Sequence, residues 1–567
     1  MRLKLLSTVL FVGAMILVGC GGGSGGDATT PIDTETNQTI IITNDYHVES
    51  LGFATTINAM VSLGSTPKSL YLVLSNNDIA SASSTITHNA KAVEVAQAKS
   101  ILPADVTERP IILHHPQYVE DFSSQMGTLL SKSEASLPQA KTIDISERTE
   151  DIIGTQDNFC VNINSSNNCI ETTRATARKV VSNVSTAFGN KTLNIWVSDN
   201  SFDSGSGCSK VRCVTEPMVD TLANTFLSTT LNNDIYDWVT NIYGEEWETD
   251  SNGHIDLIYA NDEITILLTD IDGDNSPNGG VLGFFWSKDN FVKTSVSGSN
   301  ERVMFYADAV IFANGDNTWD IDDFWPKELI STLAHEFQHM INFYQKAILL
   351  DTDIDSWINE MLSESTEDLI ATKIHHIGPR GVDYLDGSAG DPANIDGRYP
   401  LFNQYNTLSL TAWNNQSEDY SKVNAFGAYL LRNYGGAKLF HDIMHNSFED
   451  EQAVVDAVNK SPEGSGKTFA NLLSEWGTAV MLSDHDSLVD VPFYNTGDFT
   501  LSTYNNSTYD LGSINFFNYI PQPTIYTTSG TVQAQGNYYY KIGENLTGDI
   551  TLTLELNGQT EATLIAK

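Results

Sequence analysis

The distribution of hydrophobic residues changes along the chain, from short runs near both ends to longer helical patterns between them. Short apolar runs rich in β-branched and aromatic residues, such as residues 70–74 and 550–554, are typical of strands bounded by turns. They predict a β-rich module at residues 31–150 and a β-sandwich at residues 486–567. The longer patterns predict a separate unit at residues 151–485.

This central unit is predicted to contain a sheet in its first half and helices in its second half. We expect one helix and four strands first: the helix at residues 173–188 and the strands at 193–197, 255–259, 264–268 and 303–312. Helical patterns follow later, at residues 425–434, 452–458 and 469–482. This order, with β-rich modules at both ends, predicts a multidomain α+β protein.

A long amphipathic helix is predicted at residues 327–346, directly after Pro326, which a first helical turn accepts. Its apolar residues recur at spacings of mostly three and four: Leu329, Leu333, Phe337, Met340, Ile341 and Tyr344. His335 and His339 lie four residues apart within it, and therefore on one face. That spacing lets both imidazoles reach one zinc ion, with Glu336 near the water that zinc activates. The alternative is two surface histidines on an ordinary helix.

A second helical pattern begins near Asp355 and carries Glu360 and Glu364 on one face, four residues apart. Apolar residues interleave with these acids: Trp357, Ile358, Met361 and Leu362. Two carboxylates on a partly apolar face are costly without a counter-charge, and a divalent cation supplies one. The alternative is a solvated acidic face, since Glu367 and Asp368 continue the run.

These two segments carry a family resemblance. Residues 333–343, Leu-Ala-His-Glu-Phe-Gln-His-Met-Ile-Asn-Phe, are followed about twenty residues later by Asn-Glu-x-x-Ser-Glu. Together they resemble the gluzincin zinc peptidases of the thermolysin-like clan, and the first segment resembles the hyicolysin family of neutral metallopeptidases in particular. The resemblance is strong over residues 300–375 and diffuse elsewhere. It implies a two-lobed core, in which a mixed sheet and the active-site helix precede a helical lobe, with the metal between the lobes.

The resemblance also implies roles for individual residues. In such enzymes the residues corresponding to His335, His339 and Glu360 bind zinc, and the one corresponding to Glu336 is the general base. Glu364, four residues beyond the third ligand, is implied to steady one of the histidines, although the clan often has aspartate at this position.

Gluzincins often supply a tyrosine or histidine from beyond the third ligand, and this residue stabilises the oxyanion of the reaction intermediate. The candidates in this chain are His375, His376, Tyr384 and Tyr420. Tyr420 is preferred because residues 419–421 lead into a helix that can face the cleft. The alternative is a tyrosine packed at the start of a helix.

The N-terminus has the features of a bacterial lipoprotein signal. A short basic segment precedes a mostly apolar stretch at residues 5–18, which is too short for a mature membrane helix. Residues 17–20, Leu-Val-Gly-Cys, resemble the lipoprotein processing site, which implies removal of residues 1–19 and a lipid on Cys20. Residues 20–30 then form a glycine-rich flexible tether. We expect a protein anchored in the outer membrane or at the cell surface; the alternative is an ordinary secretory signal with an incidental cysteine.

The other four cysteines form two close pairs, Cys160 with Cys169 and Cys208 with Cys213. In an exported protein, such local pairs favour disulfides that close short loops. A four-cysteine metal site is the alternative, but neither pair has the two-residue gap typical of zinc ribbons.

The chain is strongly acidic, with 72 acidic and 30 basic residues and a net charge of −42, yet only 18% of its residues are charged. This composition is that of a globular protein, and its field repels phosphates, so no nucleic-acid partner is expected. Asp270, Asp272 and Asp274 alternate around Gly273 and form a candidate calcium site. The glutamate that completes an EF-hand loop is missing, so a simple solvated turn is the alternative.

These observations predict a zinc endopeptidase acting on extracellular protein or peptide substrates. One alternative is a lipid-anchored binding or adhesion protein with an inactive peptidase-like core, and another is a zinc hydrolase of small esters or glycans. Inactive relatives usually lack a ligand or the base, whereas this chain has all four residues. Residues 31–150 are expected either to stay as a spacer domain or to be removed. Removal would follow a cut in the loop-like stretch at residues 131–149 and would release a soluble catalytic unit.

Overall fold

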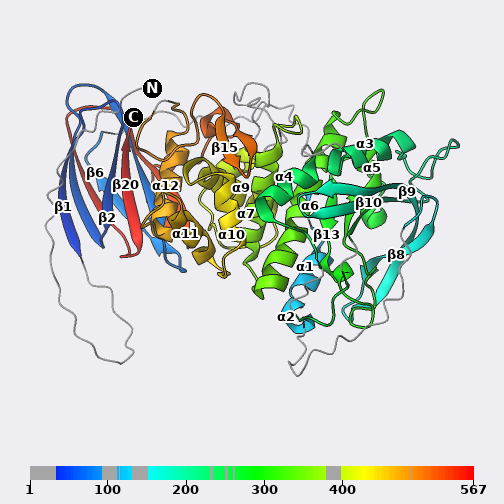
Figure 1. Cartoon of the computed structure of the whole chain (residues 1–567). Helices are drawn as coiled ribbons and strands as arrows, with labels where there is room; N and C mark the ends of the chain where they lie inside the picture. The colour runs from blue at the N-terminus through cyan, green and yellow to red at the C-terminus, as the bar shows by residue number, and fades with distance from the viewer. Residues whose placement is uncertain are drawn as a thin grey trace, which may run out of the picture.

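The computed structural model covers the chain of 567 residues, and the residues it describes are 34–91, 112–113, 115–130, 151–229, 234–248, 253–259, 262–377, 398–486 and 488–567. A β-sandwich lies at one end, a group of helices in the middle and a mixed α/β region at the other end (Figure 1). Among the described residues, no helix is both long and apolar enough to cross a membrane. The predicted signal segment and Cys20 lie outside the described residues.

The sandwich is built from strands of both ends of the chain. One sheet has the order β1 (Glu35–Ile41), β3 (Thr56–Ser62), β19 (Asp549–Glu555) and β6 (Thr85–His88). The other has the order β18 (Gly536–Leu546), β4 (Lys68–Asn76), β20 (Thr560–Ala566) and β2 (His47–Phe53). A short pair, β5 (Ala82–Ser83) and β17 (Thr531–Val532), again joins the two ends. The strands expected at residues 70–74 and 550–554 are confirmed, but they belong to one shared sandwich and not to two separate modules.

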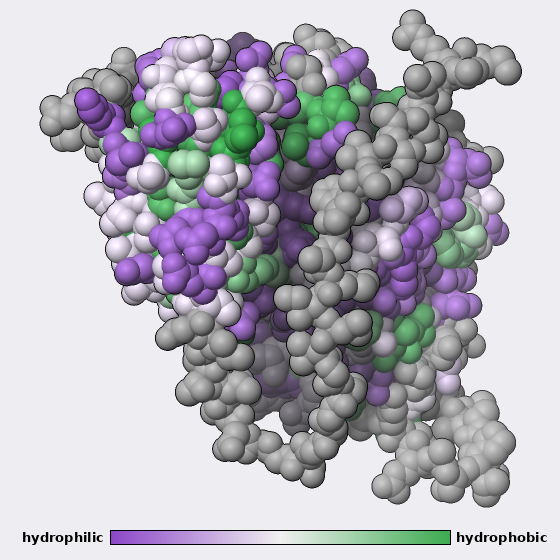
Figure 2. All heavy atoms as spheres, turned by 90° about the vertical axis from the view of Figure 1, so that its left-hand side faces the viewer, coloured by the Kyte–Doolittle hydropathy of each residue, from purple (hydrophilic) through white to green (hydrophobic). Residues whose placement is uncertain are grey.

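Alternation along the strands separates a buried face from a solvent face. In β3, Ala59 and Val61 are buried, while Met60 between them is 42% exposed. The buried side chains form a core of their own, which includes Leu554 and Leu564 from the C-terminal strands. Figure 2 faces this end of the molecule and shows hydrophobic residues scattered among hydrophilic and neutral ones.

The mixed α/β region contains a six-stranded sheet. Its order is β13 (Gly283–Phe285), β14 (Met304–Asp308), β11 (Glu263–Thr269), β10 (Gly189–Ser198), β9 (Cys169–Thr186) and β8 (Gln156–Ile163). β10, β11 and β14 are parallel to one another, and the other neighbours are antiparallel. β13 therefore forms one edge of the sheet, and it packs against the motif helix, α6 (Phe324–Asn342).

The strands expected at residues 193–197 and 264–268 are confirmed, within β10 and β11. The helix predicted at residues 173–188 is wrong, because most of these residues form β9. Its valines, such as Val180 and Val184, have a helix-like spacing, but β-branched residues also favour strands. β9 pairs with β8 on one side and β10 on the other, and this tertiary pairing decides the conformation.

Two further strand predictions need correction. Residues 255–259 form no strand; Leu257 makes an isolated bridge with Phe291. Residues 303–312 divide into β14 and the short helix α5 (Ala309–Phe312). The division falls at Asp308, whose side chain accepts hydrogen bonds from the backbone N–H groups of the second and third residues of α5 and so caps the helix.

Helices dominate the second half of the central unit. They are α6, α7 (Ser356–Ile370), α8 (Tyr399–Tyr405), α9 (Ser417–Asn433), α10 (Ala437–Met444), α11 (Glu451–Lys460) and α12 (Phe469–Leu482). After α6 the chain continues as a π-helix, η3 (Phe343–Leu350), so the predicted motif helix changes character near its end. The helices expected at residues 425–434, 452–458 and 469–482 are confirmed. The chain thus has the multidomain α+β architecture predicted from its sequence.

Helix α12 packs directly on the sandwich. The side-chain amide of Asn537 in β18 donates a hydrogen bond to the backbone oxygen of Leu473 at 3.0 Å. A Cβ atom at Gly477 would lie 2.5 Å from a methyl group of Val73, so this helix can approach the sheet only because glycine has no side chain there. The helices and the sandwich therefore form one continuous packed body.

Residues from the predicted N-terminal module also reach the α/β region. β7 (Ile112–Leu113) pairs in parallel with β12 (Gly280–Val281), and α1 (Gln117–Ser123) and α2 (Met126–Leu129) follow it. Figure 1 shows α1 and α2 beneath β13, far from the sandwich. The rings of Tyr118 and Phe122 lie 4.9 and 6.5 Å from that of Trp286. This segment therefore packs against the α/β region and not against the sandwich.

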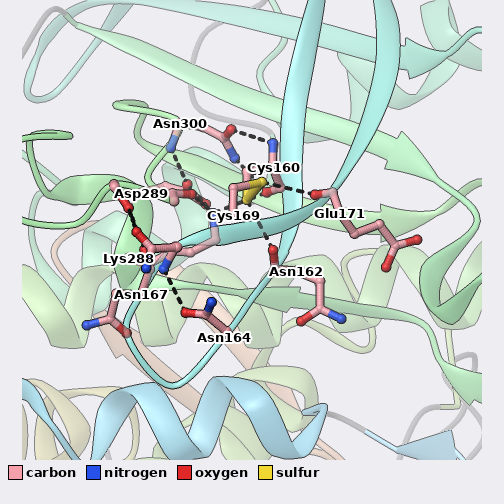
Figure 3. The surroundings of a disulfide bond; sticks show 12 residues. Cys160, Asn162, Asn164, Asn167, Cys169, Glu171, Lys288, Asp289 and Asn300 are labelled. Carbon is pink, nitrogen blue, oxygen red and sulfur yellow. Dashed lines mark hydrogen bonds and ion pairs between the residues drawn. A yellow bond between two sulfur atoms is a disulfide. The ribbon is translucent and has the colours of Figure 1, made fainter.

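Both predicted disulfides are present, with Cα separations of 5.7 and 5.8 Å: Cys160–Cys169 and Cys208–Cys213. The first links β8 to β9 beside the buried pair Lys288–Asp289 (Figure 3). Nζ of Lys288 donates to Asp289 at 2.5 Å and to the backbone oxygen of Cys160 at 3.2 Å. The disulfide thus steadies the sheet where it meets η2 (Ser287–Asn290), the turn that follows β13.

Candidate active site

Helices α6 and α7 place the three predicted metal ligands around one point. Nε2 of His335 lies 3.3 Å from Oε2 of Glu360, and Nε2 of His339 lies 3.5 Å from the same oxygen. All three side chains are buried. For metal–ligand distances of about 2.0–2.2 Å, two corners of a tetrahedron lie roughly 3.3–3.6 Å apart. These separations therefore match the edges of a tetrahedral zinc site.

A further histidine, His115, joins this cluster from outside the two helices. It precedes α1, and its Nε2 lies 3.1 Å from Nε2 of His339 and 3.3 Å from Oε1 of Glu360. Together with His335, these residues offer ligand atoms that all lie within 4.8 Å of one another. The sequence analysis missed His115 because it stands 224 residues before His339, and no local pattern connects the two.

Glu336 is held beside the cluster by the edge strand of the sheet. Its Oε2 accepts a hydrogen bond from the backbone N–H of Phe285, the last residue of β13, at 2.8 Å. Its Oε1 has no hydrogen-bond partner among the described residues. Burial raises the pKa of Glu336 well above its ordinary value, against the opposing effects of His335 and of the Phe285 amide. One carboxylate oxygen is thus fixed, and the other is available to a reacting group.

Hydrogen bonds at the second ring nitrogen orient both histidines of α6. Nδ1 of His335 lies 2.9 Å from Oε1 of Glu367, whose other oxygen accepts the hydroxyl of Ser331 at 2.6 Å. Nδ1 of His339 lies 3.1 Å from Oδ1 of Asn359. When Nδ1 is the donor in each ring, Nε2 keeps its lone pair for a metal ion.

Glu364 is held by an arginine and an asparagine from outside α7. Its carboxylate forms a two-point ion pair with Arg398, at 2.8 and 3.1 Å, and accepts a hydrogen bond from Asn424 at 3.2 Å. The hydrogen bond that steadies a histidine comes from Glu367, seven residues after Glu360 and so on the same helical face. Glu367 was seen in the sequence only as part of an acidic run, although its spacing was a usable signal.

The site concentrates negative charge in a buried place. Glu336, Glu360, Glu364 and Glu367 are each at most 3% exposed, and Arg398 offsets one of these charges. Although burial alone raises the pKa of Glu360, the surrounding histidines lower it well below its ordinary value, which keeps this carboxylate ionised. Buried carboxylates in such number require a counter-charge. The nitrogen and oxygen donors of the cluster suit zinc, so the residues present fit this metal.

A cavity of about 310 Å³ opens beside the cluster. Its lining includes His339 and Glu360 from α6 and α7 and Phe285 from the edge strand. Val119 and Met126, from α1 and α2, line the same space. The upstream segment therefore borders the cavity that two of the candidate ligands, His339 and Glu360, also line.

Comparison with known proteins identifies the family of the chain. The family model described as Peptidase M30 matches residues 171–538, which is more than half of the chain. The chain belongs to peptidase family M30. It is also 24% identical over 284 residues to the neutral metalloprotease ShpI of Staphylococcus hyicus. That match covers 48% of this chain and 53% of the relative, so it spans about half the length of each. The hyicolysin-type resemblance seen in the sequence is thereby confirmed.

Tyr420, the preferred candidate for oxyanion stabilisation in this M30 family member, is buried in the first turn of α9. Its hydroxyl donates to Oδ1 of Asn415 at 2.7 Å, and the guanidinium of Arg398 lies 5.5 Å from its ring centre. Burial, and then the charge of Glu360, raise the pKa of Tyr420 well above its ordinary value.

The other candidates for this role are located differently. Nε2 of His376 lies 3.0 Å from a carboxylate oxygen of Glu328 on α6, and His375 precedes it with a positive φ of 55°. Tyr384 lies outside the described residues. Tyr420 therefore stays the preferred candidate.

The aspartate-rich turn gains no support as a calcium site. Asp270 forms an ion pair with Lys210, and its other oxygen accepts the backbone N–H of Asn275 at 3.0 Å. Asp274 accepts the backbone N–H of Ser276 at 2.8 Å. Two of the three carboxylates thus hold the turn itself. The metal-capable clusters found among the described residues lie at α6 and α7 instead, one of them together with His115.

Proposed function

We propose that this M30 family member is a zinc-dependent endopeptidase that hydrolyses protein or peptide substrates at the bacterial cell surface or outside the cell. The observation that carries the proposal is the tetrahedral spacing around Glu360, with Glu336 fixed beside it. Membership of a peptidase family and similarity to a neutral metalloprotease support the same reaction class.

In this proposal His335, His339 and Glu360 hold zinc, which when bound supplies a Lewis acid for the scissile carbonyl and lowers the pKa of water. Oε1 of Glu336 takes the proton of the attacking water and delivers it to the leaving amine. The backbone N–H of Phe285 keeps the carboxylate in position for both transfers. Because the carboxylate is fixed and buried, proton transfer needs little reorganisation of the surrounding groups and solvent, and this favours the rate of hydrolysis.

The position of β13 favours a polypeptide substrate over a small ester or glycan. β13 lies at the edge of its sheet, and its last residue contacts the general base. An extended peptide can add to such an edge through main-chain hydrogen bonds, which would bring its peptide bonds past Glu336.

The proposal includes export and a lipid on Cys20, which rest on the sequence of residues 17–20 and on the glycine-rich tether. The competing proposal is a surface binding or adhesion protein with an inactive core. The presence of both histidines, the base and the third ligand favours the enzyme.

Zinc content and casein hydrolysis of the chain from Cys20 onward test the proposal, before and after limited proteolysis between residues 131 and 149. We expect one zinc per chain, chelator-sensitive hydrolysis, and loss of hydrolysis with retained zinc in Glu336→Gln. Glu328→Gln, on the same helix, is the matched control and should keep both properties. Full zinc content without chelator-sensitive hydrolysis in either form would favour the binding protein.

A further inference from the structure

We propose that His115 is a fourth protein ligand of the metal, and that residues 115–130 block the active site in the intact chain. The inference rests on the proposed zinc peptidase function. His115 lies upstream of residues 171–538, so the family match does not include it.

The geometry of His115 is that of a ligand and not of a neighbouring side chain. Its Nε2 atom lies 3.1 Å from Nε2 of His339 and 3.3 Å from Oε1 of Glu360. These distances are close to the edge length of a tetrahedral zinc site, as are those between Glu360 and the two motif histidines. The residue is buried, and its Nε2 atom points into the cluster. Four protein donors around zinc form a closed site, whereas a catalytic zinc keeps one position for water and substrate.

The main chain before His115 is bound like an extended peptide. Ile112 and Leu113 pair with Gly280 and Val281 of β12, and a single residue separates β12 from the edge strand β13. Strand addition of this kind is a common way to bind a peptide segment. Pro116 follows and disfavours a helical conformation at His115, so the helix begins only at Gln117 and His115 can reach the metal.

Apolar packing holds the rest of the segment over the cavity. Val119 and Phe122 of α1 and Met126 of α2 are buried. The ring of Phe122 lies 6.0 Å from that of Phe291 and 6.5 Å from that of Trp286, both in or next to the turn that follows β13. The segment thus fills space beside Glu360 that a substrate would otherwise occupy.

The consequence is a latent form of the enzyme that becomes active when residues 115–130 leave the site. Departure of this segment would open the fourth position at the metal and, at the same time, expose the region next to β13. The sandwich strands are not part of this segment, so its displacement does not require the sandwich to come apart.

Cobalt substitution of the full chain tests the ligand directly, because the absorption of protein-bound cobalt depends on its donor atoms. The parent chain, His115→Ala and Gln117→Ala are compared at equal cobalt content; Gln117 is exposed and lies in the same segment, so it is the matched control. We expect a shifted cobalt spectrum only for His115→Ala. We also expect His115→Ala to hydrolyse a short peptide about tenfold faster or more. An increase of this size corresponds to an active site that is open in one molecule in ten of the parent chain and in all molecules of the variant.

Each other result decides against the proposal. An unchanged cobalt spectrum in His115→Ala would show that His115 is not a ligand. A shifted spectrum without a faster peptide reaction would show that the ligand does not block the site. Loss of cobalt with the fold intact by circular dichroism would make His115 a required ligand of the active enzyme. His115→Gln, which keeps more of the side-chain volume, replaces alanine if that variant does not fold.

If the parent chain and all variants fail to bind zinc or cobalt, the proposed function fails. Glu336-dependent hydrolysis without a spectral change leaves that function standing and removes only this inference.

Discussion

Nδ1 of His335 lies 2.9 Å from Oε1 of Glu367, and this hydrogen bond joins the two helices that carry the metal ligands. It fixes the ring so that Nε2 faces Glu360. Removing the partner leaves the imidazole free to rotate and to exchange its tautomer. Partners of this kind typically contribute a factor of ten to a hundred in metal affinity.

We therefore predict that Glu367→Ala weakens zinc binding by about ten- to a hundredfold. Competition with a zinc-sensitive dye measures the effect. Ser331→Ala removes only the bond to the other oxygen of Glu367 and should weaken binding less. If Glu364→Ala weakened zinc binding more than Glu367→Ala, with the fold intact, Glu364 would have the role that the family resemblance implied for it.

Local periodicity predicted the part of the site that lies on single helices. The helices carrying His335 and Glu360 follow from apolar spacings of three and four, and their facing residues follow from the helical repeat. The choice between Glu364 and Glu367 could not be made in this way, because both lie on the ligand face of α7. Arg398, which directly precedes α8, pairs with Glu364, and this contact between distant segments is not contained in the helical repeat.

Contacts between distant segments account for what the sequence did not predict. β9 contains valines at helical spacing, yet two neighbouring strands give it a sheet conformation. The sandwich joins strands from opposite ends of the chain, and His115 approaches the metal ligands from a segment with no recognisable motif. Pairings of this type depend on tertiary structure, which a one-dimensional pattern does not contain.

Tyr420→Phe tests the candidate oxyanion donor. If the hydroxyl stabilises the intermediate, we expect kcat to fall by about a hundred- to a thousandfold with little change in KM. The same change also removes the hydrogen bond to Asn415. Asn415→Ala is therefore the control: it breaks that bond while keeping the phenol. Equal losses in both variants would assign Tyr420 a packing role.

The buried ion pair between Arg432 and Asp368 should contribute to the stability of the helical region. Nη1 of Arg432 lies 2.8 Å from Oδ2 of Asp368, and both side chains are almost inaccessible to solvent. Asp368→Asn leaves a buried guanidinium without its counter-charge, so we expect the free energy of unfolding in urea to fall by about 3–5 kcal/mol. Asp442→Asn breaks the more exposed pair with Lys438 and should cost about 1 kcal/mol or less. Similar losses for the two variants would mean that burial does not determine the cost.

The shared sandwich predicts what a single cut between residues 131 and 149 does. Strands β1, β2, β3, β4 and β6 share both sheets with C-terminal strands, and their buried residues form one core. A cut chain should therefore keep its N-terminal fragment bound, and any lipid on Cys20 would still anchor the catalytic region.

A cleavage site for a specific protease, introduced between residues 131 and 149, allows the test. After cleavage, we expect both fragments to elute together in native buffer and to separate in denaturant. Leu564→Asp, which places a charge in the sandwich core, is the control and should allow the fragments to part. Separation of the parent fragments without denaturant would show that the strands of the two ends do not hold each other, and a cut would then release a soluble catalytic unit.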